Sequence, residues 1–292
     1  MFCTGTETCQ IGSCVASGNP CTTQQLCFEP NICQDVDYST DYKGYWRFEG
    51  NADDETGTYN GDVFGNPKYV SGKQGQALEF NGTNDYVETY FNGTEYDGLT
   101  ILAWVNTKDV SRQNSYIIDN SPWNSGGFGF IGNYNDFDFW VVNGFNMSDI
   151  AKVRVNDILA LNTWVHLVGV HNRTDNVVYI NGVKSGSKSY ITASGIADSN
   201  DLTVIGASHN QDRRYMWNGT IDEVMIYNRV LSESEIFQIY ESQGGEVSSL
   251  SPFTKIWNFL KALLTRKTAN AILTGKTING NVVRNVTKLN IR

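Results

Sequence analysis

The chain has 292 residues, 28 glycines, 12% aromatic residues and only five prolines, and its formal net charge is −9. A chain of this length can bury a full β-sandwich core and carry one or two small appendages. The glycine and aromatic content favours an all-β domain with many tight turns. The acidic balance excludes nucleic acid as an expected partner, because acidic side chains repel the phosphate backbone.

The charge is distributed unevenly along the chain. No Asp or Glu follows Glu246, whereas the residues after it include eight Lys and Arg side chains. Subtracting these eight from the 22 basic residues leaves 14 against 31 acidic residues, a net charge of −17 for the remainder. A basic tail of this kind could bind an acidic surface or a membrane. We expect it instead to fold back on the acidic body or to link to a further domain.

The first 36 residues form a cysteine-rich segment. Gly, Thr, Ser, Gln and Asn separate the cysteines and cannot build a core, so the segment is predicted to be a small disulfide module outside the reducing cytosol. Zinc is the weaker interpretation, because no Cys-x-x-Cys occurs and the first histidine is His166. The pairing stays open among the six cysteines, which are Cys3, Cys9, Cys14, Cys21, Cys27 and Cys33.

The start of the chain leaves no room for a signal peptide, because only Met1 and Phe2 precede the first cysteine. We therefore expect a processed or truncated part of a longer surface protein. No apolar run reaches the length of a transmembrane segment.

A polar connection at 37–43 leads into a main domain predicted at 44–244. Short apolar or alternating runs are separated there by Gly and Asn turns, at 45–48, 77–80, 99–105, 140–142, 164–171, 177–180 and 202–205. Ten or more strands over about 200 residues fit an all-β, two-sheet antiparallel jelly-roll sandwich better than a seven-stranded immunoglobulin sandwich. Three tryptophans lie within these strands and are predicted to be core residues, Trp46, Trp104 and Trp164.

The last predicted strand carries an acid on an apolar line. Asp222, Val224 and Ile226 share one parity, so in a strand they would point the same way, into the core. An acid there is costly unless a partner such as a cation neutralises it. After the strand, Ser232 and Glu235 have the spacing of a capping box. They predict a short helix with apolar residues at helical spacing, Ile236, Ile239 and Tyr240.

A basic C-terminal extension is predicted at 250–292. Apolar residues from Phe253 to Leu264 are helix-spaced, and a hairpin or strand pair is expected around Asn279-Gly280. This extension could dock on the sandwich, bind to a membrane surface as an amphipathic helix or support self-assembly. We favour docking or self-assembly.

Five segments together resemble a laminin-G-like, concanavalin-A-like lectin/glucanase jelly-roll domain. They are Gly44–Gly61, Gly72–Glu88, Leu99–Thr107, Asn162–Ser187 and Trp217–Ile236, and they occur in the order and spacing of that family. The resemblance spans about residues 44–244 and leaves out the cysteine-rich segment and the basic extension. It implies a curved sandwich that binds glycans or surface proteins.

The resemblance also implies a structural calcium ion. The residues that match the calcium-linked motif are Asp54 and Asp222, with backbone oxygens near Asn60 as further ligands. Calcium binds mixed carboxylate and carbonyl oxygens, which a Gly- and Asp-rich loop provides. The alternative is that Asp54 caps a turn and that Asp222 pairs with an Arg or a backbone N–H group.

The sequence does not predict an enzyme. Related glycan hydrolases place acids in a Glu-x-Asp-x-x-Glu pattern, which is absent here. Asp136 and Asp138 are the nearest acid pair, and we expect them at a solvated strand edge or loop. His166 is predicted to be a hydrogen-bonded core residue. Neither His171 nor His209 has a nearby Ser or Cys in the arrangement of a catalytic triad.

Aromatic residues in Gly- and Asn-rich stretches are the candidate ligand contacts, because their faces can stack on sugars. The alternative for each is that it caps the sandwich core. The candidates are Trp123, Tyr134, Trp140 and Trp217. Six sequons are present, a number expected by chance, and they mark candidate N-glycosylation sites at Asn81, Asn92, Asn146, Asn172, Asn218 and Asn285.

Two classes of function remain. The first is a secreted or cell-surface recognition module, such as an adhesion glycoprotein domain, that binds a glycan or a surface protein. The second is a structural subunit of an extracellular assembly or filament that uses its N- or C-terminal segment as a connector.

Overall fold

The computed structural model describes most of residues 41–246 and short pieces on either side. The described ranges are 7–10, 13–16, 25–28, 32–35, 41–91, 98–120, 127–142, 150–189, 202–209, 215–246, 277–278 and 281–282. The chain divides into two units, Met1–Gly245 and Glu246–Arg292. In the second unit, β20 (Thr277–Ile278) pairs with β21 (Asn281–Val282), as the predicted strand pair requires. The predicted helix at 253–264 lies outside the described residues.

Two hairpins lie in the cysteine-rich segment. Strand β1 (Glu7–Gln10) pairs with β2 (Ser13–Ala16), and β3 (Gln25–Phe28) pairs with β4 (Ile32–Asp35). The backbone register sets two pairs of cysteine positions opposite each other, Cys9 with Cys14 and Cys27 with Cys33. Cys3 and Cys21 lie outside the described residues. Disulfide bonding stays a prediction.

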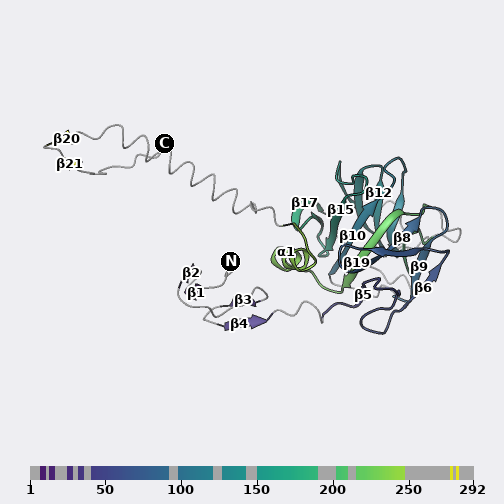
Figure 1. Cartoon of the computed structure of the whole chain (residues 1–292), viewed down its shortest axis with the longest axis horizontal. Coiled ribbons are helices and arrows are strands. Elements are labelled where there is room, and N and C mark those ends of the chain that lie inside the picture. The colour runs from purple at the N-terminus through teal and green to yellow at the C-terminus, as the bar shows by residue number, and fades with distance from the viewer. Residues whose placement is uncertain are drawn as a thin grey trace. The chain divides into compact units, whose positions relative to one another are not determined.

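Two antiparallel sheets form the main domain (Figure 1). The eight-stranded sheet has the order β17-β16-β15-β10-β19-β8-β7, and β5 also pairs with β19. Its strands are β5 (Gly44–Trp46), β7 (Lys68–Ser71), β8 (Gln76–Asn81), β10 (Leu99–Thr107), β15 (Trp164–His171), β16 (Asp175–Ile180), β17 (Val183–Ser189) and β19 (Asn218–Tyr227).

The seven-stranded sheet has the order β14-β13-β12-β11-β18-β9-β6. Its strands are β6 (Gly61–Phe64), β9 (Tyr86–Thr89), β11 (Ser115–Asn120), β12 (Gly127–Asn133), β13 (Asp136–Val142), β14 (Ile150–Val155) and β18 (Thr203–Ile205). The predicted all-β, two-sheet antiparallel sandwich is therefore confirmed, and its arrangement is consistent with a jelly roll.

Local chemistry explains the central strands and their turns. Strand β10 is buried at every position except Asn106, because β15 and β19 flank it and both its faces are covered. Asn181 and Gly182 join β16 to β17 with φ angles of 50° and 74°. Two left-handed residues match the twist of the flanking strands, which is why an Asn-Gly pair suits this hairpin.

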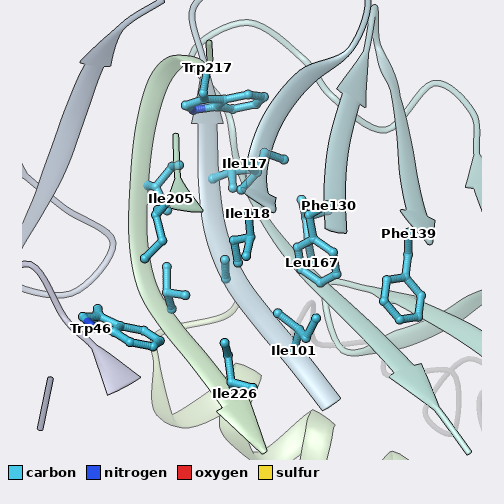
Figure 2. Packing of buried hydrophobic residues seen from close by; sticks show 14 of the residues in the cluster. Trp46, Ile101, Ile117, Ile118, Phe130, Phe139, Leu167, Ile205, Trp217 and Ile226 are labelled. Carbon is cyan, nitrogen blue, oxygen red and sulfur yellow. The ribbon is translucent and has the colours of Figure 1, made fainter. Parts of the chain in front are cut away.

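The core lies between the two sheets, where apolar side chains from both inner faces interdigitate (Figure 2). Trp46, Phe130 and Phe139 are fully buried there. The ring of Phe139 lies against Gly169 of the opposite sheet, where a Cβ would be only 2.6 Å from Cδ2 of the ring. Gly169 therefore permits this close approach of the sheets. Of the three tryptophans predicted in the core, Trp46 and Trp104 are buried, and Trp164 is half-buried.

Helix α1 (Glu233–Ser242) covers part of the outer face of the eight-stranded sheet. Its N-terminus has the predicted capping box, in which Ser232 and Glu235 each accept a backbone N–H of the other. Its buried side chains stabilise the domain by roughly 1.5–3 kcal/mol each. Ile236 and Ile239 join a second apolar cluster on this face, which also includes Leu102, Val168, Met225 and Tyr227.

Replacing Gly169 should test the contact between the sheets. We expect Gly169→Ala to lower the free energy of unfolding by about 1–3 kcal/mol, because the new methyl group collides with the Phe139 ring in a packed core. Gly186→Ala is the control, since its Cβ would lie 3.1 Å from Val153 Cγ1 at the edge of the sheet. Denaturant titration gives both values, and equal losses would show that this contact does not limit packing.

Candidate functional site

A β-bulge in strand β19 determines where its acids lie. The bulge is at Glu223, whose φ is 51°, and the register with β10 shifts there. Asp222 is therefore opposite Trp104, on the outer face of the sheet that also carries helix α1. The residues of β19 that point into the core are Ile221, Val224 and Ile226. The predicted inward orientation of Asp222 is wrong, because the extra residue of the bulge reverses the alternation.

Backbone N–H groups bind one oxygen of Asp222. Its Oδ2 accepts hydrogen bonds from the N–H groups of Lys73 at 2.7 Å and Gln74 at 3.1 Å. Burial raises the pKa of Asp222 to about 7, although these bonds act in the opposite direction. Asp222 Oδ1 has no hydrogen-bond partner.

Asp54 caps its own loop. It accepts bonds from the N–H groups of Tyr45 at 2.7 Å, Thr58 at 3.3 Å and Tyr59 at 3.1 Å, and from the hydroxyl of Thr56. Oδ1 accepts the bond from Tyr45, and Oδ2 accepts the other three. Within the described ranges, no group of three or more His, Cys, Asp or Glu side chains could hold a metal ion.

The side chain of Asn60 has a similar local role, since its Oδ1 accepts a hydrogen bond from the N–H of Asp54 at 3.0 Å. Asp54, Asn60 and Asp222 are thus all held by hydrogen bonds of the protein itself. Calcium binding at these residues stays a prediction.

A polar cluster attaches the end of helix α1 to the sheet. The side chain of Gln243 accepts a bond from Trp104 Nε1 at 3.0 Å and donates one to Glu223 Oε2 at 2.9 Å. The Tyr45 hydroxyl also donates to Glu223 Oε2, and the Tyr240 ring stacks on Trp104. Burial raises the pKa of Glu223. These contacts close this part of the outer face.

His166 lies within this cluster, with its ring 5.0 Å from that of Trp104 and 5.6 Å from that of Tyr240. It is fully buried, as predicted, but neither ring nitrogen has a hydrogen-bond partner, so the predicted side-chain hydrogen bond is wrong. Burial, together with the charge of Lys73, lowers the pKa of His166 to about 3.

The outer face of the seven-stranded sheet carries a different set of residues. We call the part formed by β11, β12, β13 and β14 the β11–β14 face. One cross-strand row on it consists of Tyr116, Ile131, Asp138 and Arg154. The next row consists of Asp119, Gly129, Trp140 and Lys152. The face thus combines aromatic, acidic and basic side chains.

An ion cluster occupies one side of the β11–β14 face. Arg154 binds Asp138 with two hydrogen bonds, from Nε to Oδ1 and from Nη2 to Oδ2, both 2.7 Å long. Lys152 Nζ lies 3.3 Å and Asn133 Nδ2 3.4 Å from Oδ2. Burial opposes ionisation of Asp138, but Arg154 and Lys152 outweigh it and hold its pKa below the ordinary value. Asp138 is 1% exposed, so the predicted solvated position is wrong for it; Asp136 is half-buried.

The predicted ligand aromatics separate into three groups. Two are buried: Trp217, which is 1% exposed, belongs to the core (Figure 2). Trp140 is 6% exposed; its ring lies against Gly129, and its Nε1 has no hydrogen-bond partner. Tyr134 is exposed in the turn between β12 and β13. Trp123 lies outside the described residues.

Tyr215 is an exposed aromatic residue that the sequence reading missed. Its ring packs on that of Tyr116, with centroids 6.2 Å apart, and its carbonyl accepts the N–H of Tyr116. Its φ is 60°, which is unfavourable for a bulky side chain. The available signal was an aromatic residue at the end of a polar run just before Trp217.

Three of the candidate glycosylation sites are described. Asn81 and Asn172 are exposed, and Asn218 is half-buried. Asn92, Asn146 and Asn285 lie outside the described residues, and modification stays a prediction for all six. No helix in the described part is long and apolar enough to cross a membrane.

Comparison with known proteins identifies a family. A family model with the description "Concanavalin A-like lectin/glucanases superfamily" matches residues 81–237, which is more than half of the chain. No curated protein sequence matches the chain.

Several solved structures have a similar fold. Domain 4 of an extracellular arabinanase from Geobacillus stearothermophilus, solved with arabinotriose, is 20% identical, with a TM-score of 0.57; the match covers 68% of this chain and 98% of that one. The receptor binding domain of a botulinum neurotoxin C/D mosaic serotype is 17% identical, with a TM-score of 0.56 and coverages of 70% and 51%. The binding domain of Paraclostridial Mosquitocidal Protein 1 is 18% identical, with a TM-score of 0.55 and coverages of 69% and 52%. The match thus spans about half the length of the two toxin domains.

His166 should make stability depend on pH. The pKa of His166 is about 3 in the folded protein and 6.5 ordinarily, so His166 does not lower the free energy of unfolding above pH 6.5. As the pH falls from 6.5 toward 3, the unfolded state binds a proton that the folded state does not, and the free energy of unfolding decreases. Between pH 6.5 and 3, we expect the free energy of unfolding of His166→Leu to rise relative to that of the wild type by about 1.4 kcal/mol for each unit by which the pH is lowered. The difference between the two proteins isolates His166, because the raised pKa of Asp222 acts in the opposite direction in both. Unfolding curves that keep a constant difference from pH 7.5 to 4 would contradict this role.

Proposed function

The chain belongs to the concanavalin A-like lectin/glucanases superfamily, and from this premise we propose that it is a non-catalytic module that binds a glycan through the β11–β14 face. The observation that carries the proposal is Tyr215, an exposed ring held against Tyr116, which lies in the same cross-strand row as Asp138 and Arg154.

The chemistry of this face suits a sugar. A sugar ring has an apolar C–H side and a rim of hydroxyl groups, so it needs an aromatic surface next to polar groups in fixed positions. Tyr116 and Tyr215 supply the aromatic surface. Across Ile131, the side chains of Lys152 and Arg154 are about two-fifths exposed and are oriented by Asp138.

The strain at Tyr215 supports a functional role. A left-handed backbone at a bulky residue costs about 1–3 kcal/mol and persists only where the surrounding structure enforces it. The bond from the Tyr116 N–H to the Tyr215 carbonyl, together with the bridge between Tyr116 and Met216, enforces it here. The opposite outer face is a weaker candidate, because helix α1 and Gln243 close much of it.

The structural neighbours support a binding role. The arabinanase domain was solved with arabinotriose, and botulinum neurotoxin DC binding domains were solved with SialylT and with rat synaptotagmin II. By this analogy we propose a glycan ligand, with a surface protein as the alternative. We also propose that the module works outside the cell or at its surface.

Catalysis by the nearest acid pair is disfavoured by its electrostatics. A glycosidase needs one carboxylic acid that stays protonated near neutral pH. The bond from Arg154 and the charge of Lys152 hold Asp138 ionised, so it cannot serve as that acid. The alternative function, an assembly subunit that connects or self-assembles through its terminal segments, rests largely on residues outside the described ones and stays a prediction.

Removal of the exposed ring should weaken glycan binding. On a glycan array followed by titration of the best ligand, we expect Tyr215→Ala to weaken affinity about tenfold, because it removes a stacking surface. Tyr90→Ala is the control, since Tyr90 is an exposed tyrosine bonded to Asp62 at a different part of the sheet. Equal effects of the two substitutions, or an array without any bound glycan, would argue against the proposal.

The family resemblance alone supports a structural calcium ion at Asp54, Asn60 and Asp222. If the ion is bound, calcium should raise the melting temperature, and a chelator should lower it by several degrees, because a ligand of the folded state adds its binding free energy to stability. Asp54→Asn should remove the response. An identical melting temperature in calcium and in chelator would contradict the calcium site. The carboxylates of Asp54 and Asp222 would then be held by their hydrogen bonds without an ion.

A further inference from the structure

The two cations of the β11–β14 face are already engaged by a carboxylate of the protein. Both oxygens of Asp138 bind Arg154, and Lys152 lies next to one of them. Arg154 binds in the two-bonded geometry that arginine also uses for ligand carboxylates. Asp138 therefore occupies the position that an anionic group of a ligand would take.

We propose that Asp138 determines specificity on this face: it excludes sialylated and sulfated glycans and restricts the ligand to neutral saccharides. The inference rests on the proposed glycan-binding function and names the class of glycan. Asp138 competes with an anionic ligand for Lys152 and Arg154.

Burial makes this competition effective. Asp138 is 1% exposed, whereas the side chains of Lys152 and Arg154 are 44% and 38% exposed. If Arg154 turned outward to an anionic ligand, it would break both of its bonds to the buried carboxylate and leave only Lys152 at 3.3 Å, which is strongly unfavourable. The ligand would have to supply that cost in addition to its own desolvation.

The surrounding charge acts in the same direction. Asp119 and Asp136 share the face with Asp138, so its three acids outnumber Lys152 and Arg154. All residues up to Glu246 together carry a net charge of −17. The negative electrostatic potential of these charges disfavours the approach of an anionic ligand.

A neutral sugar can still use the cations. Lys152 makes one contact with Asp138, so its ammonium group retains further protons for hydroxyl groups. Arg154 Nη1 lies 3.8 Å from Asp136 Oδ2, too far for a hydrogen bond, and can donate to a hydroxyl in the same way. The ion cluster then acts as a rigid donor array, separated from the Tyr116–Tyr215 pair by Ile131 of β12.

The first test uses the wild-type chain and pairs of oligosaccharides that differ only by a terminal sialic acid. We expect the neutral member of each pair that binds to bind at least about tenfold more tightly, by calorimetry at physiological salt. Equal or tighter binding of the sialylated member would overturn the inference. Absence of binding by every saccharide would instead defeat the proposed function and leave the second test to decide the role of Asp138.

The second test uses inorganic sulfate and needs no glycan. In Asp138→Asn the two cations lose their internal carboxylate, so we expect sulfate to bind about 10- to 100-fold more tightly than to the wild type. Asp136→Asn is the matched control, because it removes the same charge from the same face but contacts Arg154 only at 3.8 Å. The readouts are sulfate titrations at constant ionic strength and a melting curve that verifies folding. Equal sulfate affinity of the two variants would overturn the inference, and if Asp138→Asn does not fold, the wild-type comparison decides.

Discussion

A sandwich of two sheets has two outer faces, and in the part of the chain that the structure describes a single ten-residue helix is available to cover them. The inner faces carry the apolar core and hold the sheets together. Helix α1 covers apolar residues on the eight-stranded sheet, and Gln243 at its end binds Trp104 and Glu223. On the β11–β14 face the exposed side chains are those of Tyr215, Lys152 and Arg154, and the proposed function follows from them.

The bulge at Glu223 links the helix to the sheet. Without the extra residue, Asp222 would point into the core with Val224 and Ile226 and would require a neutralising partner there. With it, Asp222 and Glu223 both lie under the loops and the helix that cover the outer face. Asp222 binds backbone N–H groups, and Glu223 binds Gln243. A single irregular residue thus moves Asp222 from the core to the outer face, where the loop at Lys73 and Gln74 binds it, and places Glu223 where Gln243 binds it.

Local patterns were enough to predict the fold but not the site. The apolar run at 99–105, which lies in β10, and the capping box at Ser232 depend on neighbouring residues, and both are confirmed. The side on which Asp222 lies depends on how β19 pairs with β10, more than 100 residues away. Likewise, Asp138 is neutralised by Arg154 on the next strand. Parity and composition contain no information about such pairings, and they do not distinguish Trp217, which is buried, from Tyr215, which is exposed.

The most direct test of the account is a hydrogen-exchange map of the chain with and without a saturating glycan ligand. We expect slower exchange of amides in β11, β12, β13 and β14 and around Tyr215, because these strands carry the proposed binding face. Exchange in helix α1 and in β15 to β17 should stay unchanged. Protection confined to helix α1 and β15 to β17, or to the terminal segments, would contradict it.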